Sequence, residues 1–276
     1  MVELFSEILG KTVVVPDRPK RIVSFSPAVT ETLFGLGLED SIVGVSAFCA
    51  KPPAAKLKRH VGSYNTVSYE LLDDLKPDLI FTVMGYQRDF ALRLSQRYPV
   101  YPVELPVSVA GIVDMVVKVG LVAAAPEKAR ELSRALLGHL ASIGRRKGLT
   151  AYVEIDLGGP VSFGAHSYIT DAINLLGSAS LFEKERVEWL TPDLGKVRAA
   201  DPDVIIYEPK MFSKFESSDL EELIGSRSWR DMRAVRAGNL FVTPGPLDFI
   251  AHHGPSFITD AVPWLGDKLD EAAARV

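Results

Sequence analysis

The chain has 276 residues, which is enough for one large domain or for two lobes of ordinary size. With 47% hydrophobic and 24% charged residues, its composition is that of a soluble globular protein. It has 31 Lys and Arg against 35 Asp and Glu, and the formal charge of -4 argues against a nucleic-acid partner, for which a basic surface is typical.

The N-terminal segment does not have the features of a targeting sequence. Residues 1–15 have neither a basic start nor a continuous apolar core, so they do not predict a signal peptide. No run of about 18 apolar residues follows, and no membrane-spanning helix is expected. We therefore expect either a cytoplasmic protein or an exported protein whose mature chain carries an added Met1.

Short apolar runs that alternate with helical patterns predict two series of βα units. Alternation of this kind is typical of a mostly parallel sheet covered by helices. The first series of expected strands comprises residues 22–25, 42–45, 79–83 and 100–103, and the second comprises residues 151–155, 204–207 and 240–243.

The two series contain a repeated segment. Residues 75–81 read Leu-Lys-Pro-Asp-Leu-Ile-Phe, and residues 200–206 read Ala-Asp-Pro-Asp-Val-Ile-Ile, so that the prolines at positions 77 and 202 are 125 residues apart. Proline disfavours helical geometry in the residue before it, so each copy predicts a short helix, a Pro-Asp turn and a buried strand. A matched pair of this kind indicates an internally duplicated βα lobe.

A helix is predicted between the two series, over residues 126–146. Pro126 suits its first position, and an apolar stripe follows at spacings of three and four residues, formed by Ala129, Leu132, Leu136, Leu140 and Ile143. Arg145 and Arg146 complement the dipole at its end. We expect an N-terminal α/β lobe at 1–105, a connecting helical segment at 106–148 and a C-terminal α/β lobe at 149–276, which gives two Rossmann-like lobes joined by one long helix.

The motifs that usually mark an enzyme or a cofactor site are absent from the sequence. There is no glycine-rich nucleotide-binding motif and no nucleophile elbow, and the lone Cys49 has no identifiable activating partner. The adjacent pair His252 and His253 matches metal-site spacing poorly, although a ligand contact stays open. We expect no catalytic residue, no bound metal and no cofactor.

Candidate ligand-binding residues follow the predicted strands. Ligands of open α/β sheets bind beyond the carboxyl ends of the strands, so we expect the ligand in a cleft between the lobes. Ser26 has the alternative role of a plain helix cap, and each aromatic residue has an alternative place in the core. The expected ligand-binding residues are Ser26, Pro27, Tyr64, Asn65, Met84, Tyr86, Gln87, His166, Tyr168, Phe212, Asp248, Phe249 and His252.

The opening of the first series resembles one known family. Residues 21–31, Arg-Ile-Val-Ser-Phe-Ser-Pro-Ala-Val-Thr-Glu, and residues 69–80, from Tyr-Glu-Leu-Leu to Pro-Asp-Leu-Ile, are similar to those of the helical-backbone (class III) solute-binding proteins of ABC importers. This family carries vitamin B12, ferric siderophores and haem. The resemblance covers residues 12–269 and implies two α/β lobes, a stiff connecting helix that limits closure, and a binding protein without enzymatic activity.

The resemblance also implies a permease partner and residues that dock onto it. In the family, an acidic residue on each lobe meets arginines of the permease, and the first falls on Glu70. The repeat places the second at position 195, where this sequence has Gly195; the nearest acid is Asp193, which has the alternative role of a helix cap.

The family resemblance narrows the ligand to a metal chelate. Residues 248–255 and the Arg186-Val187-x-Trp189 segment resemble the vitamin B12-binding member, whereas Tyr64 lies within one residue of the iron-ligating tyrosine of haem-binding members. We expect a corrinoid or ferric chelate as ligand, ABC permease subunits as partners, a monomer, and a periplasmic or membrane-associated extracytoplasmic location. The alternatives are a haem receptor of the same family, and a cytoplasmic corrinoid-binding or metal-chelate-binding protein or enzyme on the same scaffold.

Overall fold

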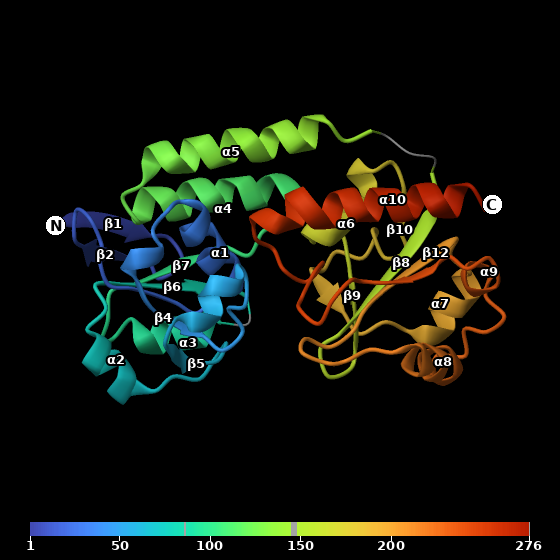
Figure 1. The fold of residues 1–276 in the computed structure, drawn as a ribbon, viewed down its shortest axis with the longest axis horizontal. Coiled ribbons are helices and arrows are strands. Elements are labelled where there is room, and N and C mark those ends of the chain that lie inside the picture. Colours follow the sequence, from blue (N-terminus) through green and yellow to red (C-terminus); the bar gives the residue numbers. More distant parts are fainter. Residues whose placement is uncertain (86, 145–147, 276) are drawn as a thin grey trace. The chain divides into compact units, whose positions relative to one another are not determined.

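The computed structural model describes residues 1–85, 87–144 and 148–275. The chain is mixed α/β and forms two compact units, each of which draws on two stretches of sequence (Figure 1). Unit 1 comprises Met1–Pro106 and Ile112–Gly138, and unit 2 comprises Val107–Gly111 and His139–Val276. In the described residues, no helix is both long enough and apolar enough to cross a membrane.

Unit 1 is built on a five-stranded parallel sheet with the order β5-β4-β3-β6-β7. Its strands are β3 (Ile22–Ser24), β4 (Ile42–Ser46), β5 (His60–Gly62), β6 (Leu79–Val83) and β7 (Val100–Val103). The strand order reverses between β3 and β6, which makes this pair the switch point where ligands of such sheets bind. An antiparallel hairpin of β1 (Val2–Ser6) and β2 (Lys11–Val15) completes the strands of this unit.

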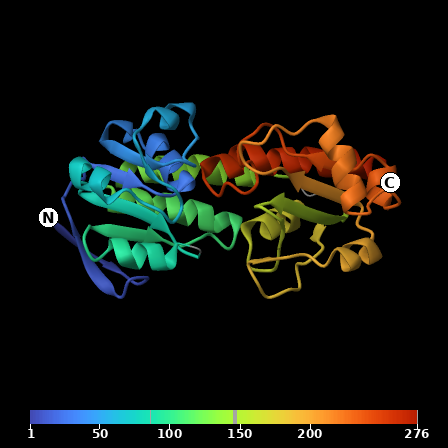
Figure 2. The same cartoon turned by 90° about the horizontal axis from the view of Figure 1, so that it is seen from below.

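Helices lie on both sides of the sheet of unit 1 (Figure 2). They are α1 (Pro27–Gly35), α2 (Tyr69–Leu75), α3 (Arg88–Leu94), α4 (Val109–Val122), whose first residues belong to unit 2, and α5 (Pro126–Ala141), with two short 3₁₀ turns at Glu39–Ser41 and Pro53–Leu57. One face of the sheet packs Val23, Phe25 and Ile80 against apolar residues of α2 and α3. Burial of these side chains is the main term that stabilises the unit.

Unit 2 has a mixed sheet with the order β11-β9-β8-β12-β13, and β10 also pairs with β8. Its strands are β8 (Thr150–Asp156), β9 (Pro160–Phe163), β10 (Ala179–Ser180), β11 (Trp189–Leu190), β12 (Val204–Glu208) and β13 (Leu240–Val242). Strands β10, β8, β12 and β13 pair in parallel, whereas β9 and β11 are antiparallel to their neighbours. Its helices are α6 (Tyr168–Leu175), α7 (Leu194–Ala200), α8 (Ser217–Ser226), α9 (Arg233–Arg236), a π-helical turn (Phe257–Ala261) and α10 (Val262–Ala273).

The predicted repeat is present in the structure at the same spacing. Helices α2 and α7 begin and end 125 residues apart, and so do strands β6 and β12. Ser68 and Asp193 cap the two helices, and the residues that end them, Lys76 and Asp201, both have left-handed backbone angles with φ of 46° and 45°. The duplication therefore extends to the capping geometry as well as to the hydrophobic pattern.

The connecting helix is shorter than the sequence predicts. Helix α5 begins at Pro126 as expected but ends at Ala141, five residues before the predicted end. The backbone N–H groups of Ser142 and Ile143 turn back to the carbonyls three residues earlier, and the hydroxyl of Ser142 donates to the carbonyl of His139. These tighter bonds end the α-helix. Arg145 and Arg146, which we expected in its last turn, lie outside the described residues.

Candidate ligand-binding loops

Gln87 connects three loops at the carboxyl edge of the sheet of unit 1. Its side chain is fully buried, and its amide oxygen accepts the backbone N–H of Val83 at 2.8 Å. Its amide nitrogen donates to the carbonyls of Phe25 at 3.3 Å and Tyr64 at 2.5 Å. Val83 is the last residue of β6, Phe25 directly follows β3, and Tyr64 lies in the loop after β5. One side chain thus spans the switch point and fixes the backbone around it.

Tyr64 is half-buried and stacks on Phe48. Their ring centroids lie 4.3 Å apart, and their planes differ by 12°. Phe48 lies in the loop after β4, and Tyr64 lies in the loop after β5. The pair forms a flat aromatic surface at the edge of the sheet where a ligand is expected. The sequence analysis did not select Phe48; its position two residues after the end of β4 was the available signal.

The other predicted residues of unit 1 have more varied environments. Ser26 is buried and accepts the backbone N–H of Val29, so its cap role is present, while a ligand contact remains a prediction. Pro27 is buried, Met84 is half-buried and Asn65 is exposed. Tyr86 lies outside the described residues.

In unit 2, a buried carboxylate organises the loop that follows β13. Glu208, the last residue of β12, is 1% exposed. One of its oxygens accepts the backbone N–H groups of Phe249 at 3.0 Å and Ile250 at 2.6 Å, and the other accepts that of Ala251 at 3.0 Å. Burial, together with the charge of Asp248, raises the pKa of Glu208 to about 7, although the three N–H donors oppose this shift.

Tyr168 contacts the same loop from helix α6. Its hydroxyl donates a bifurcated hydrogen bond to the carbonyls of Ile250 at 3.0 Å and Ala251 at 2.8 Å, and its ring packs edge-on against Phe257. We predicted Tyr168 as a ligand contact. In the structure its hydroxyl is directed onto the backbone of this loop, and the side chain is 6% exposed.

The remaining predicted residues of unit 2 lie around this loop or on neighbouring loops. Asp248 and Phe249 are half-buried, His252 is buried, and Phe249 packs edge-on against Trp264. Phe212 is 51% exposed, and its backbone N–H donates to the carbonyl of Pro246 at 2.6 Å, which joins the loop after β12 to the segment before Asp248. His166 is exposed on the segment after β9.

A second buried carboxylate lies on the opposite face of the sheet of unit 2. Glu154 is fully buried, pairs with Arg227 at 2.8 Å and accepts the hydroxyl of Tyr152 at 2.6 Å. Burial and this neighbouring carboxylate raise the pKa of Tyr152. The group packs with Trp229 and helix α8, away from the ligand loops, and we assign it a structural role.

The two predicted docking acids differ in their surroundings. Glu70 is exposed in the first turn of α2. Asp193 caps α7, where its carboxylate accepts the backbone N–H groups of Gly195 at 2.9 Å and Lys196 at 3.2 Å. The alternative cap role of Asp193 is therefore confirmed. Gly195, which lies 125 residues after Glu70, has no charged side chain.

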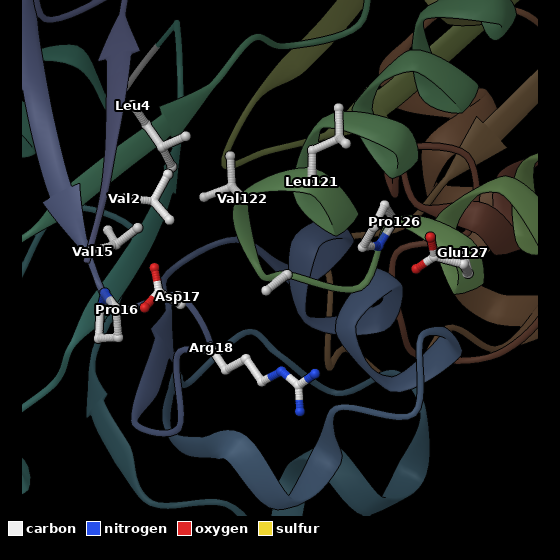
Figure 3. A pocket seen from close by; sticks show the side chains of 11 residues that line it. Val2, Leu4, Val15, Pro16, Asp17, Arg18, Leu121, Val122, Pro126 and Glu127 are labelled. Carbon is white, nitrogen blue, oxygen red and sulfur yellow. The ribbon is translucent and has the colours of Figure 1, made fainter.

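A cavity of about 360 Å³ lies elsewhere in unit 1, between the β1–β2 hairpin and the turn from α4 to α5. Figure 3 shows apolar side chains such as Val2, Leu4 and Val122 along its wall, with Arg18 and Glu127 among the charged residues that line it. No predicted ligand-binding residue lines this cavity. Across the described ranges 1–85, 87–144 and 148–275, no cluster of three or more His, Cys, Asp or Glu side chains is arranged to hold a metal ion.

Comparison with known families matches residues 22–247 to the family described as periplasmic binding protein. The chain belongs to the periplasmic binding protein family. The predicted family and the two-unit α/β fold are thereby confirmed. The match begins at β3 and includes both Gln87 and Glu208, the residues that hold the loops.

The proteins that are similar to this chain differ in the solutes for which they are named. A vitamin B12-binding protein of Yersinia pseudotuberculosis is 25% identical over 193 residues, which cover 68% of this chain and 69% of that protein. Among solved structures, a possible iron-binding periplasmic solute-binding protein from Staphylococcus epidermidis has a TM-score of 0.75 at 21% identity, covering 91% of this chain and 99% of the other. A periplasmic heme-binding protein from Roseiflexus has a TM-score of 0.72 at 20% identity, covering 92% of this chain and 99% of the other. The structural similarities establish the fold, which several ligands share.

Proposed function

We propose that this protein is the substrate-binding component of an ABC importer and that it captures a metal chelate with the loops at the carboxyl edges of its two sheets. The observation that carries this proposal is the stacked pair of Phe48 and Tyr64 in a member of the periplasmic binding protein family. A flat, half-exposed aromatic surface suits the face of a planar macrocycle, because offset stacking is favourable and buries a large apolar area.

Among the chelates, we propose a corrinoid such as vitamin B12 as the first candidate. The named vitamin B12-binding relative is 25% identical over two thirds of the chain, and the resemblance in residues 248–255 supports the same choice. Haem is the second candidate, because Tyr64 carries a phenol group of the type that ligates ferric iron, and a structurally similar protein is named for heme.

Direct binding measurements test this proposal. Purified protein is titrated with cyanocobalamin, haemin and ferrichrome by calorimetry, and visible spectra are recorded in parallel. We expect saturable binding of one of these chelates and no chemical change in it, as the absence of a recognised catalytic motif in the sequence indicates. Failure of all three to bind would contradict the proposal, and turnover of the bound chelate would favour an enzyme on this scaffold.

We further propose that the protein works outside the cytoplasm as a monomer that docks onto ABC permease subunits. Two proteins of similar fold are named as periplasmic, and exposed Glu70 offers a charge for docking. Fractionation of the native cells tests the location, and light scattering tests for a mass of 30.2 kDa. Recovery in the cytoplasmic fraction would instead support the alternative of an intracellular chelate-binding protein.

A further inference from the structure

We propose that Glu208 is the positioning residue for the ligand loop of unit 2, residues 248–253, and that its carboxylate fixes the backbone from which Asp248 and His252 reach the solute. This inference rests on the proposed function, because it assigns the loop a role in ligand binding. Glu208 itself is buried beneath the loop and acts through it.

The hydrogen-bond pattern requires two acceptor oxygens. Three consecutive backbone N–H groups, those of Phe249, Ile250 and Ala251, converge on the two oxygens of Glu208. A carboxylate offers acceptors on both oxygens, whereas the equally sized glutamine side chain offers only one and places an N–H₂ donor at the other position. The position at the end of β12 thus has a chemical requirement that size alone does not meet.

The carbonyls of the loop are fixed from a second direction. The hydroxyl of Tyr168 donates to the carbonyls of Ile250 and Ala251, so these two residues are held through both their N–H and their C=O groups. Asp248 and His252 flank the held segment on its two sides. Fixing the backbone between them sets the directions of both side chains before a ligand arrives, and such preorganisation lowers the entropic cost of binding.

The electrostatic cost of this arrangement supports a role in positioning. A carboxylate that is buried with Asp248 nearby loses solvation, which raises the pKa of Glu208 to about 7. Besides Asp248, the loop itself carries His252 and His253, and Tyr168 of α6 contacts it; α6 also carries Asp171, and β12 also carries Tyr207. In the described part of unit 2, no Lys or Arg side chain pairs with this carboxylate, in contrast to Glu154, which pairs with Arg227.

Hydrogen exchange in the ligand-free protein tests the contact itself. The variant Glu208→Gln keeps the side-chain volume and removes one acceptor, and Glu154→Gln is the matched control because it changes a buried carboxylate on the other face of the same sheet. At pH 8, where the Glu208 carboxyl is ionised, we expect amides in residues 249–251 to exchange about tenfold faster in Glu208→Gln and unchanged in Glu154→Gln, since Glu208→Gln removes one of the two acceptor oxygens for these N–H groups. Unchanged exchange in Glu208→Gln would overturn the proposal.

Affinity for cyanocobalamin tests the positioning role. We expect about tenfold weaker binding by Glu208→Gln and wild-type affinity in Glu154→Gln, measured at a temperature where circular dichroism shows both variants folded. Wild-type affinity in Glu208→Gln, with faster exchange of the loop, would show that the loop does not orient ligand groups and would overturn the inference. If wild-type protein binds neither cyanocobalamin nor the other two chelates, the proposed function fails instead, while the exchange experiment still decides whether Glu208 fixes the loop.

Discussion

The ring of Tyr64 lies parallel to that of Phe48, with 4.3 Å between the ring centroids, and the backbone carbonyl of Tyr64 accepts a hydrogen bond from Gln87. The aromatic surface is thus fixed through both its side chain and its backbone. A surface held in this way can stack on a flat ligand with little further loss of conformational freedom.

Removing the ring of Tyr64 should weaken chelate binding. For Tyr64→Ala we expect about a tenfold loss of affinity for cyanocobalamin or haemin by calorimetry, because an aromatic pair contributes about 0.5–1.5 kcal/mol beyond its buried area. The control is Tyr69→Ala, since Tyr69 also stacks on an aromatic ring, that of Tyr98, but is not one of the proposed ligand-binding residues. Equal losses in both variants would indicate that the effect is one of general stability.

Replacing Gln87 should destabilise unit 1. In Gln87→Leu, the N–H of Val83 and the carbonyls of Phe25 and Tyr64 lose the hydrogen-bond partner that they have in the wild type. Each buried polar group left without a partner lowers the free energy of unfolding by roughly 1–3 kcal/mol. We expect the free energy of unfolding in urea to fall by about 2–4 kcal/mol. Gln96→Leu, at an exposed position of the same unit, should change it by less than about 0.5 kcal/mol. A small effect of Gln87→Leu would mean that water replaces the amide.

The raised pKa of Glu208 predicts how stability depends on pH. The carboxyl has a pKa of about 7 in the folded protein, against a reference value of 4.5. The folded state therefore binds more protons than the unfolded state between these values, so the contribution of Glu208 to stability is fully present below pH 4.5 and is lost as the pH rises through 7. The free energy of unfolding in urea should fall between pH 5 and pH 8 in wild type. This fall should exceed the corresponding fall in Glu208→Gln by at most about 3 kcal/mol. Identical pH dependence in the two proteins would contradict this assignment.

Reversing the charge of Glu70 should affect transport without affecting ligand binding. Glu70 is exposed in the first turn of α2, so Glu70→Arg should leave cyanocobalamin affinity unchanged and reduce uptake through the cognate permease. Glu7→Arg provides a matched charge reversal at another exposed site of unit 1. A loss of ligand affinity in Glu70→Arg would place this residue in the binding site instead of at a docking surface.

The sequence by itself determined the features that depend on neighbouring residues. Short apolar runs between helical patterns predict the strands β3, β4, β6, β7, β8, β12 and β13. They do so because burial inside a parallel sheet requires near-continuous apolar segments. The Pro-Asp pairs at 77–78 and 202–203 identified the duplication, since proline fixes local backbone geometry in each copy. The sequence also offers helix capping as an alternative role for Ser26 and Asp193, because a side-chain oxygen just before a helix can accept its first N–H groups, and both caps are present.

Only the tertiary structure decided how the candidate loops are held. Glu208 receives its three N–H donors from residues 41 to 43 positions later, and Tyr168 donates to carbonyls 82 and 83 positions away. In the sequence, Glu208 is simply an acid that ends an apolar strand, and Tyr168 is one aromatic among many. Such contacts follow from the packing of separate elements against each other, and no local periodicity encodes them, so the repeat could be found from the chain alone while the support of the ligand loop could not.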